Sequence, residues 1–451
     1  MRRHSRLVLG AVLGASALLA AACGSDNKSS GSAATSAAAT SAAATTAAAA
    51  SANTTAAAAS ASTTAGATTT GASTKKWPAI PDGPITFGVS APLTGANAAF
   101  GGAVQKAFEN VTLAKFNEMH PDGIDGHKVQ ISVKDDGSDV TTAVNVANQF
   151  VSDKVAGMVT LTYNPAATPQ QIAIFNKNKV PMVAVRGDKD LTDTSKWPYW
   201  FGLSPSNPQE QDAAAKWIAA HPEIKTIGVL TDNLPADKEL LDLLTASLKT
   251  AAPNVKFLDT ASVTPGAVDV STAIAQLKGG NPDLLYVNMG YGYGPVWQAI
   301  KAAGWSPKIM TSAGAWYDGF DAMGDLAQNA VAAYYTCAKQ GHPPFTPQLT
   351  DLMGAYTTVF GTTSTNYLTY VSSDNSPLEI LKTAIEKNHS IDPDAIKDAI
   401  ETMGPQTYFG ALQYNYSKDN HFGITGDYGA AVCKMGEPYS DGGARIPFVA
   451  T

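Results

Sequence analysis

Hydrophobic and polar positions from residue 85 onward alternate between two periods along the chain. A half-buried strand is predicted where apolar and polar residues alternate, at Val129, Ile131 and Val133. An amphipathic helix is predicted where apolar residues recur at helical spacing, at Val104, Ala107, Phe108 and Val111. Further strands are predicted at 157–161, 180–185, 226–230, 284–288 and 308–311, separated by helices at 141–151, 169–178, 208–220, 236–250, 270–278 and 295–303. Such repeated strand and helix units predict an α/β fold with parallel sheets covered by helices on both faces.

The length of this patterned region predicts two lobes. Residues 77–451 number about 375, which is more than one ordinary hydrophobic core accommodates. We therefore expect two cores, each built around its own sheet.

The N-terminus has the pattern of an export signal. Three arginines precede an apolar run at residues 7–19, and three alanines then lead to Cys23. The run is shorter than the roughly 18 residues of a membrane-spanning helix, and no other stretch is long and apolar enough. We predict a signal peptide at residues 1–22 and a mature protein without a transmembrane helix.

Cys23 and the residues after it indicate an anchored tether. Small residues followed by Cys23 resemble a bacterial lipobox, in which the thiol is acylated; ordinary signal cleavage with a free Cys23 is the alternative. Residues 29–74 are almost wholly Ala, Ser, Thr and Gly, a composition that cannot build a core. Residues 23–76 are predicted to be a flexible tether, whose roughly 50 residues would span on the order of 40 Å.

Charge and cysteine usage exclude two classes of function. Removal of residues 1–22 takes away three arginines and no acid, which changes the net charge from −7 to −10. An acidic chain without a basic run argues against nucleic-acid binding. The cysteines beyond Cys23 are Cys337 and Cys433, without a Cys-x-x-Cys or His/Cys cluster, so we expect no structural metal.

Several short segments, in one order and spacing, resemble the leucine/isoleucine/valine-binding protein family. They are the run 85–95, the segments Phe100-Gly101-Gly102, Phe116-Asn117 and 123–126, the pair Asp135-Asp136, the helix 143–150, and the segments 281–283 and 300–304. The resemblance covers essentially the whole patterned region. It implies the type I periplasmic-binding fold, with two doubly wound parallel-sheet lobes joined by a three-strand hinge and a ligand at the carboxyl ends of the strands.

The resemblance also predicts where the chain crosses between lobes. Crossings are expected near Ser204, Thr336 and Thr425. Lobe 1 would then comprise residues 77–204 and 337–425, and lobe 2 would comprise residues 205–336 and 426–451. Strands at 331–337 and 428–433 should lie side by side, and we expect a disulfide between Cys337 and Cys433, because isolated cysteine pairs outside the cytoplasm usually join. A buried, unpaired Cys433 is the alternative.

Candidate ligand contacts in lobe 1 follow three strands. Phe100 lies where the family commonly presents an aromatic wall, or else packs under the first helix. The turn containing Tyr163 and Asn164 precedes a helix at Pro169, whose free N–H groups suit an anionic group; the alternative is a simple capping turn. Arg186 stands where family members usually have small or hydroxylated residues. It either binds a carboxylate with two hydrogen bonds or pairs with Asp188 on the surface.

Candidate contacts in lobe 2 are aromatic. Tyr291 and Tyr293 lie among glycines after a predicted strand, and Trp316 follows the next strand, where aromatic packing within the lobe is an equal alternative. Amino-acid binders of the family usually place an acid near here for the ligand's ammonium group, and this loop has none. A branched-chain amino acid, an amide, a small carboxylate and an aromatic acid all remain admissible.

These patterns together predict a receptor and not an enzyme. Dinucleotide, nucleophile-elbow and metalloprotease motifs are absent from the sequence, so neither catalytic residues nor a cofactor is expected. We predict a monomeric, lipid-anchored, extracytoplasmic solute-binding protein that delivers a small molecule to the membrane permease of an ABC importer. The alternative is a sensor that signals to a membrane partner.

Overall fold

The structure is a computed structural model that describes the folded part of the chain. It describes residues 76–95, 98–162, 164, 166–232, 234–290, 292–312, 320–334, 338–339, 346–361, 370–425, 429–434, 439–441, 444–446 and 449–450. The signal peptide, Cys23 and almost all of the tether lie outside these residues. No helix in the described part of the chain is long and apolar enough to cross a membrane.

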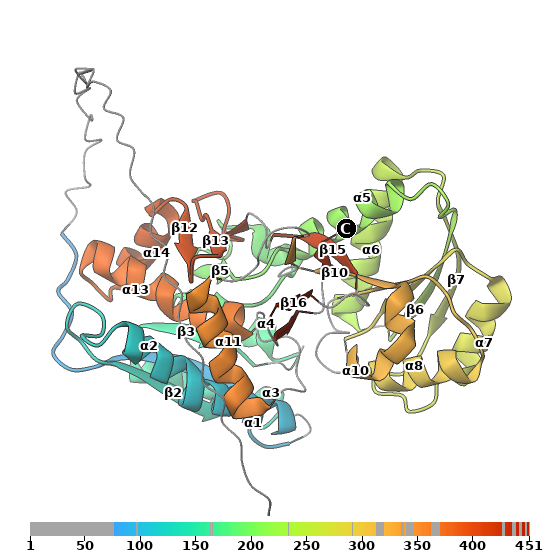
Figure 1. Cartoon of the computed structure of the whole chain (residues 1–451). Helices are drawn as coiled ribbons and strands as arrows, with labels where there is room; N and C mark the ends of the chain where they lie inside the picture. The colour runs from blue at the N-terminus through green and yellow to red at the C-terminus, as the bar shows by residue number, and fades with distance from the viewer. Residues whose placement is uncertain are drawn as a thin grey trace, which may run out of the picture. The chain divides into compact units, whose positions relative to one another are not determined.

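The first sheet is parallel and has the strand order β2-β1-β3-β4-β5. Figure 1 labels its strands β2, β3 and β5. Its strands are β1 (Ile85–Ala91), β2 (Val129–Asp135), β3 (Gly157–Thr160), β4 (Met182–Ala184) and β5 (Trp200–Gly202). The helical segments between them are α1 (Ala98–Ala107), η1 (Phe108–Thr112), α2 (Leu113–Met119), α3 (Val140–Asp153), α4 (Thr168–Lys177) and η2 (Lys189–Thr192). The order reverses between β1 and β3, which is where open α/β sheets bind ligands.

Each face of the first sheet is covered by helices. Met158 and Trp200 pack with Phe150 of α3 and Phe175 of α4. Val159 and Phe201, the next residues along the same strands, belong to a second cluster with η1 and with helices from later in the chain. Burial on both faces explains why β3 reads as a continuous apolar run and not as an alternating one.

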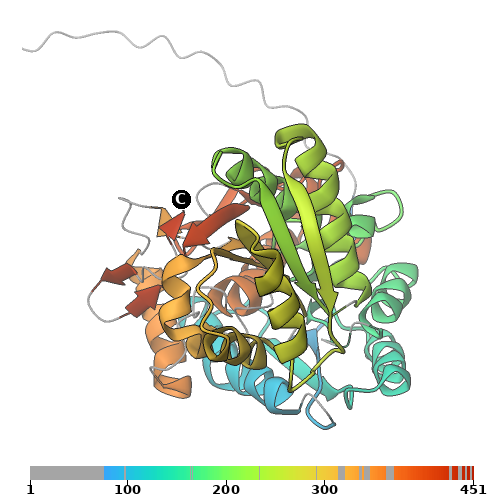
Figure 2. The same cartoon turned by 90° about the vertical axis from the view of Figure 1, so that its right-hand side faces the viewer.

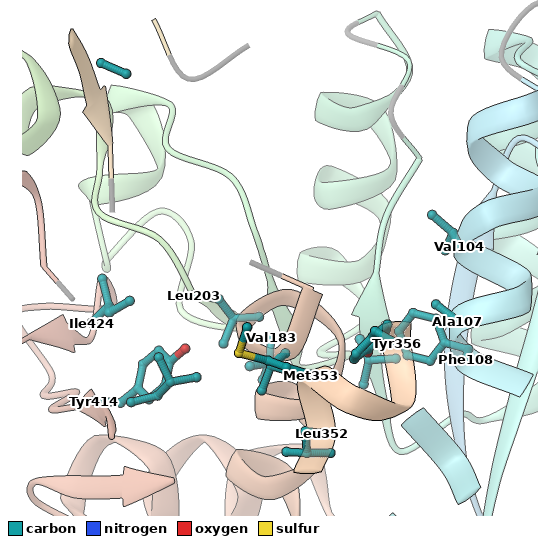
Figure 3. Packing of buried hydrophobic residues seen from close by; sticks show 14 of the residues in the cluster. Val104, Ala107, Phe108, Val183, Leu203, Leu352, Met353, Tyr356, Tyr414 and Ile424 are labelled. Atoms are coloured by element: carbon teal, nitrogen blue, oxygen red, sulfur yellow. The ribbon is translucent and has the colours of Figure 1, made fainter. Parts of the chain in front are cut away.

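A later segment returns to the first sheet. It contains α11 (Pro347–Phe360), η4 (Val371–Asn375), α13 (Ser376–Asn388) and α14 (Pro393–Thr402), followed by a small antiparallel sheet of β12 (Gln406–Tyr408), β13 (Leu412–Tyr414) and β14 (Ile424–Thr425). Figure 3 shows Tyr356 of α11 beside Phe108, and Met353 beside Val183 and Leu203. The π-helical segments η1 and η4 are also in contact.

The second sheet repeats the first arrangement and then adds antiparallel strands. Its order is β11-β18-β15-β10-β9-β8-β6-β7, and the strands β6 to β10 are parallel to one another. The strands are β6 (Thr226–Thr231), β7 (Lys256–Ser262), β8 (Leu284–Asn288), β9 (Ile309–Thr311), β10 (Ala330–Tyr334), β11 (Ala338–Lys339), β15 (Ala431–Lys434) and β18 (Val449–Ala450). The order β7-β6-β8 places a second reversal point between β6 and β8.

Helices cover both faces of this sheet as well. They are α5 (Asn207–Ala219) and α6 (Pro235–Ala251) against one apolar cluster, and α7 (Ser271–Gly280) and α8 (Tyr293–Ala302) against another. Figure 2 shows the long helix α6 lying along the sheet. The segments α10 (Phe320–Met323) and η3 (Gly324–Asn329) precede β10, and β16 (Tyr439–Asp441) pairs with β17 (Ala444–Ile446).

The structure confirms the α/β class, the two sheets and each strand and helix predicted from the pattern within the described residues. The predicted neighbouring strands are β10 and β15, which pair antiparallel with Ala332 opposite Cys433. Residues 338–339, just after the crossing expected near Thr336, pair with β18 in the second sheet.

Local sequence signals fix several helix starts. The Asp139 side chain accepts a hydrogen bond from the Thr142 N–H at 2.8 Å and caps α3. At α5, Ser206 and Gln209 form a capping box in which the Ser206 N–H donates to Gln209 at 2.8 Å. Proline at the first turn of α4, α5 and α6 costs no hydrogen bond and marks the same boundary.

Candidate functional site

A buried polar network joins the carboxyl ends of β1, β2 and β3. The Ser90 hydroxyl donates to Asp136 at 3.3 Å, and the Gln171 amide of α4 donates to Ser90 at 2.9 Å. The Thr162 N–H in turn donates to Gln171 at 3.2 Å. Burial raises the pKa of Asp136, while hydrogen bonds from Thr162 and Ser138 oppose that shift. These bonds fix the loop after β3 relative to α4 and to the residue that follows β2, so the strand ends at this edge of the sheet are held in place.

Asn164 shapes the turn after β3. Its side-chain oxygen accepts from the N–H groups of Ala166 at 3.0 Å and Ala167 at 3.3 Å, and its amide nitrogen donates to the Ser138 carbonyl at 3.1 Å. Both polar ends of the side chain are therefore engaged inside the protein. Asn164 therefore stabilises the turn that precedes α4.

A cavity of about 60 Å³ lies at the carboxyl ends of β3 and β4. It is lined by Val159, Thr160, Leu161, Thr162, Thr168, Ala184, Val185, Arg186 and Ser373. Ser373 comes from η4, so the later segment completes a site begun by the first sheet. The space suits a few water molecules or a small polar group such as a carboxylate.

Arg186 is the one charged residue in this lining, and its side chain is 22% exposed. Its Nε donates to Asp188 Oδ2, and its Nη2 donates to Asp188 Oδ1 at 3.1 Å. The pair with Asp188 that the sequence allowed is therefore present, and it lies at the edge of the cavity instead of on the open surface.

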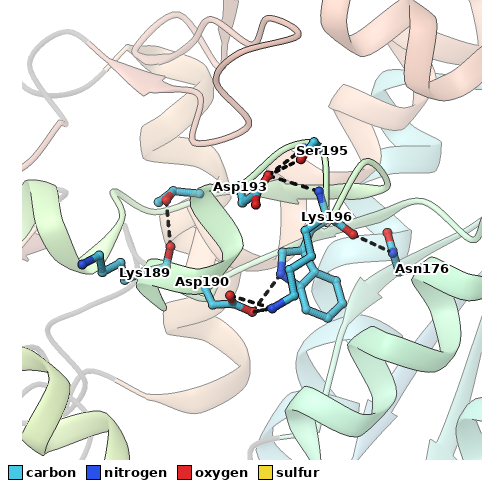
Figure 4. Close-up of polar contacts among 8 residues, drawn as sticks. Asn176, Lys189, Asp190, Asp193, Ser195 and Lys196 are labelled. Atoms are coloured by element: carbon cyan, nitrogen blue, oxygen red, sulfur yellow. Dashed lines mark hydrogen bonds and ion pairs between the residues drawn. The ribbon is translucent and has the colours of Figure 1, made fainter.

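The loop that carries Arg186 is held at several points. Gly187 accepts from the Asn207 N–H at 2.5 Å, and the Lys189 N–H donates to Glu239 of α6 at 2.9 Å. Figure 4 shows the rest of the loop, where Asp190 binds Lys196 at 2.6 Å. These contacts leave the backbone after β4 little freedom, which fixes the position of Arg186.

Two buried acids lie at the carboxyl end of β6, beside β8. Asp232 accepts from the Leu234 N–H and the Gly290 N–H, each at 3.1 Å, and is 1% exposed. Asp237 is 3% exposed, and burial together with the charge of Asp232 raises the pKa of its carboxyl. Neither acid is presented to solvent, so neither offers an open carboxylate to a cationic ligand group.

Tyr293, a predicted ligand contact, is buried in the core of the second sheet in this structure. Its ring is fully buried and stacks on Trp297 with ring centroids 5.6 Å apart. Its hydroxyl donates to the Met289 carbonyl at 2.5 Å and lies 2.9 Å from the Ser312 hydroxyl. The physical reason is local, since Gly292 with φ of +83° starts α8 and turns the next side chain into the core. The Tyr293 hydroxyl thus links the residues that follow β8 and β9.

Other predicted site residues are only partly described. Phe100 lies in α1, but its side chain is outside the description, and Tyr163, Tyr291, Trp316 and Cys337 lie outside the described residues. Cys433 lies in β15, again without a described side chain. Among the described residues, no group of His, Cys, Asp or Glu side chains is placed to hold a metal ion.

Sequence reasoning missed Ser373 and Asp374. They belong to a π-helical segment about two hundred residues after β3, and no local pattern ties them to that strand. The Ser373 hydroxyl donates to Asp374 at 2.7 Å. The π-helical turn that carries them is visible only in the fold.

Comparisons with known proteins agree with this architecture. The Leu/Ile/Val-binding protein homolog 3 of Brucella melitensis biotype 1 is 26% identical over 343 residues, which cover 74% of this chain and 88% of the relative. The structure of the branched-chain amino acid transporter substrate binding protein LivJ from Streptococcus pneumoniae, in complex with isoleucine, has a TM-score of 0.63 at 17% identity. That match covers 82% of this chain and 99% of the other.

A third comparison is with an ABC transporter solute-binding protein from R. palustris in complex with benzoate. Its TM-score is 0.64 at 14% identity, and the match covers 82% of this chain and 98% of the other. The likeness to both solved structures concerns the fold. The sequence profile described as periplasmic binding protein matches residues 84–436, which span nearly all of the two sheets. On this match, the chain belongs to the periplasmic binding protein family.

Proposed function

We propose that this protein is the solute-binding component of a bacterial ABC importer and that it holds one small polar solute per chain in a cleft between two lobes. The observation that carries the proposal is the polar cavity at the carboxyl ends of β3 and β4, next to the reversal point of a doubly wound sheet. It is lined by hydroxyls and one arginine and is supported by a buried network. We expect it to act as a receptor and not as an enzyme.

The two sheets support the proposed lobes. The first would comprise residues 77–204 and 337–425. The second would comprise residues 205–336 and 426–451, since β15 and β18 complete its sheet. Closure of the lobes around a solute would exclude water from both sets of contacts, so neither lobe alone should bind well.

The solute is proposed to be a branched-chain amino acid, an amide, or a small or aromatic carboxylate. Relatives named for leucine, isoleucine and valine and a neighbour in complex with benzoate support this range. Tyr291, Trp316 and Phe100 remain proposed apolar contacts for its side chain.

The N-terminal segments support the proposed location. Residues 1–22 would direct export, acylated Cys23 would anchor the chain to the outer face of the cell membrane, and residues 23–76 would let the folded part reach the permease. We propose that the protein acts as a monomer.

A thermal-shift screen against the four solute classes, followed by calorimetry, tests the proposal. We expect one site per chain and a loss of about tenfold to a hundredfold in affinity for Tyr291→Ala, which removes a buried aromatic contact. A well-folded protein that binds no member of any class would contradict the proposed function.

A further inference from the structure

The cavity hydroxyls have little donor capacity left for a solute. Each hydrogen atom is already given to an internal acceptor: Thr160 donates to the Val159 carbonyl at 2.8 Å, Thr168 to the Thr162 carbonyl at 2.7 Å and Ser373 to Asp374 at 2.7 Å, while Thr162 binds Asp136. A hydroxyl that donates internally can still accept a hydrogen bond. These side chains therefore present acceptors to the cavity.

Arg186 is the side-chain donor that remains. A guanidinium carries five N–H groups, and Asp188 engages only the edge formed by Nε and Nη2. Within the described residues, no other partner of this guanidinium is recorded. The N–H groups of Nη1 and the second N–H of Nη2 therefore remain available to a ligand. The free edge has the geometry that binds a carboxylate with two parallel hydrogen bonds.

Building on the proposed function, we infer that the solute carries a carboxylate and that this group binds the free edge of Arg186. A neutral amide offers one acceptor oxygen, and its N–H₂ group would face the guanidinium, so it makes a poorer partner. The hydroxyl oxygens of Thr160 and Ser373 can accept from a hydroxyl or a protonated group near the carboxylate.

The second sheet indicates that an α-ammonium group is not required. Asp232 follows β6 and Asp237 lies in the first turn of α6, and both are buried; Asp232 accepts from two backbone N–H groups, whereas Oδ2 of Asp237 has no hydrogen-bond partner among the described residues. An ammonium group would find no open carboxylate among the described strand ends of this sheet. The class that fits is an organic acid with an apolar body, bound through its carboxylate.

Matched ligand sets test this assignment by calorimetry on the full mature chain. One set is 4-methylpentanoate, 4-methylpentanamide and L-leucine, and the other is benzoate and benzamide. We expect at least one carboxylate to bind about 100-fold more tightly than its amide, and no less tightly than the amino acid.

Variants then assign the effect to one side chain. Arg186→Ala should weaken the carboxylate about 100-fold, and Arg186→Lys should restore part of the loss as a point charge without the paired geometry. Lys189→Ala is the matched control, because it removes an equal charge from the same loop at an exposed residue that does not line the cavity. Its affinity should stay within about twofold of wild type.

The outcomes separate the two proposals. Equal binding of carboxylate and amide, or unchanged affinity in a folded Arg186→Ala protein, would overturn the inference and leave the solute-binding function standing. Tighter binding of leucine than of 4-methylpentanoate would also overturn it. A wild-type protein that binds none of the five compounds would count against both.

Discussion

The carboxyl of Asp374 is buried in η4, and its burial should make the stability of the protein depend on pH. The side chain is 6% exposed, one oxygen accepts from Ser373, and the other has no hydrogen-bond partner among the described residues. Burial raises the pKa of Asp374 from 3.8 to about 7.

The sign of the effect follows from this upward shift. Between the two pKa values the folded chain keeps a proton that the unfolded chain releases, so stability falls as the pH rises. The stabilisation of the folded chain by this proton is complete below the pKa of Asp374 in the unfolded chain, and it is lost as the pH approaches 7. Each pH unit removes about 1.4 kcal/mol, which gives a loss of about 4 kcal/mol as an upper bound.

Asp374→Asn removes the titrating group and keeps the size of the side chain. Urea unfolding of both proteins at pH 5, 6, 7 and 8 gives the free energy of unfolding, and all other titrations cancel in the difference. Wild type should lose about 2 to 3 kcal/mol more than the variant between pH 5 and 8. Asp82→Asn, at an exposed acid, is the control and should follow wild type. Parallel pH profiles for wild type and Asp374→Asn would refute the reasoning.

The remaining predictions concern the anchor, the disulfide and one tight packing contact. Radiolabelled fatty acid should enter the native chain but not Cys23→Ser, and equal labelling would contradict acylation. Non-reducing peptide mapping should find Cys337 joined to Cys433, a link worth about 4 kcal/mol for a loop of roughly 95 residues, whereas two free thiols would exclude it. Gly202→Ala should destabilise the fold by about 1 to 3 kcal/mol, because the new Cβ would lie 2.7 Å from the Phe422 ring. In contrast, Gly279→Ala, which meets nothing within 4 Å, should not lower the urea midpoint.

Periodicity was enough to predict the regular elements that carry the two sheets. The alternation at Val129, Ile131 and Val133 is β2, and the helical spacing from Val104 to Val111 spans α1 and η1. The edge strand β7 escaped prediction because most of its residues are exposed, so its sequence carries little hydrophobic signal. β5 is only three residues long and gives too short a pattern.

The candidate site was only partly predictable. Arg186 and the turn at Asn164 follow strands, where the general rule for open sheets expects a site, and Arg186 lines the cavity. The position of Ser373 could not be predicted from the sequence, because its contact with β3 depends on how a distant segment packs against the first sheet. The burial of Tyr293 depends on the left-handed Gly292 at the start of α8, which hydropathy alone does not reveal.

The C-terminal strands of the second sheet have a consequence for the order of folding. The first sheet uses strands from one continuous stretch, residues 85–202, whereas β10 receives its partner β15 about a hundred residues later. Because the chain is synthesised from its N-terminus, β10 keeps an open edge until β15 has emerged. A chain truncated after Thr425 would retain every strand of the first sheet and expose β10 as an unpaired template for aggregation.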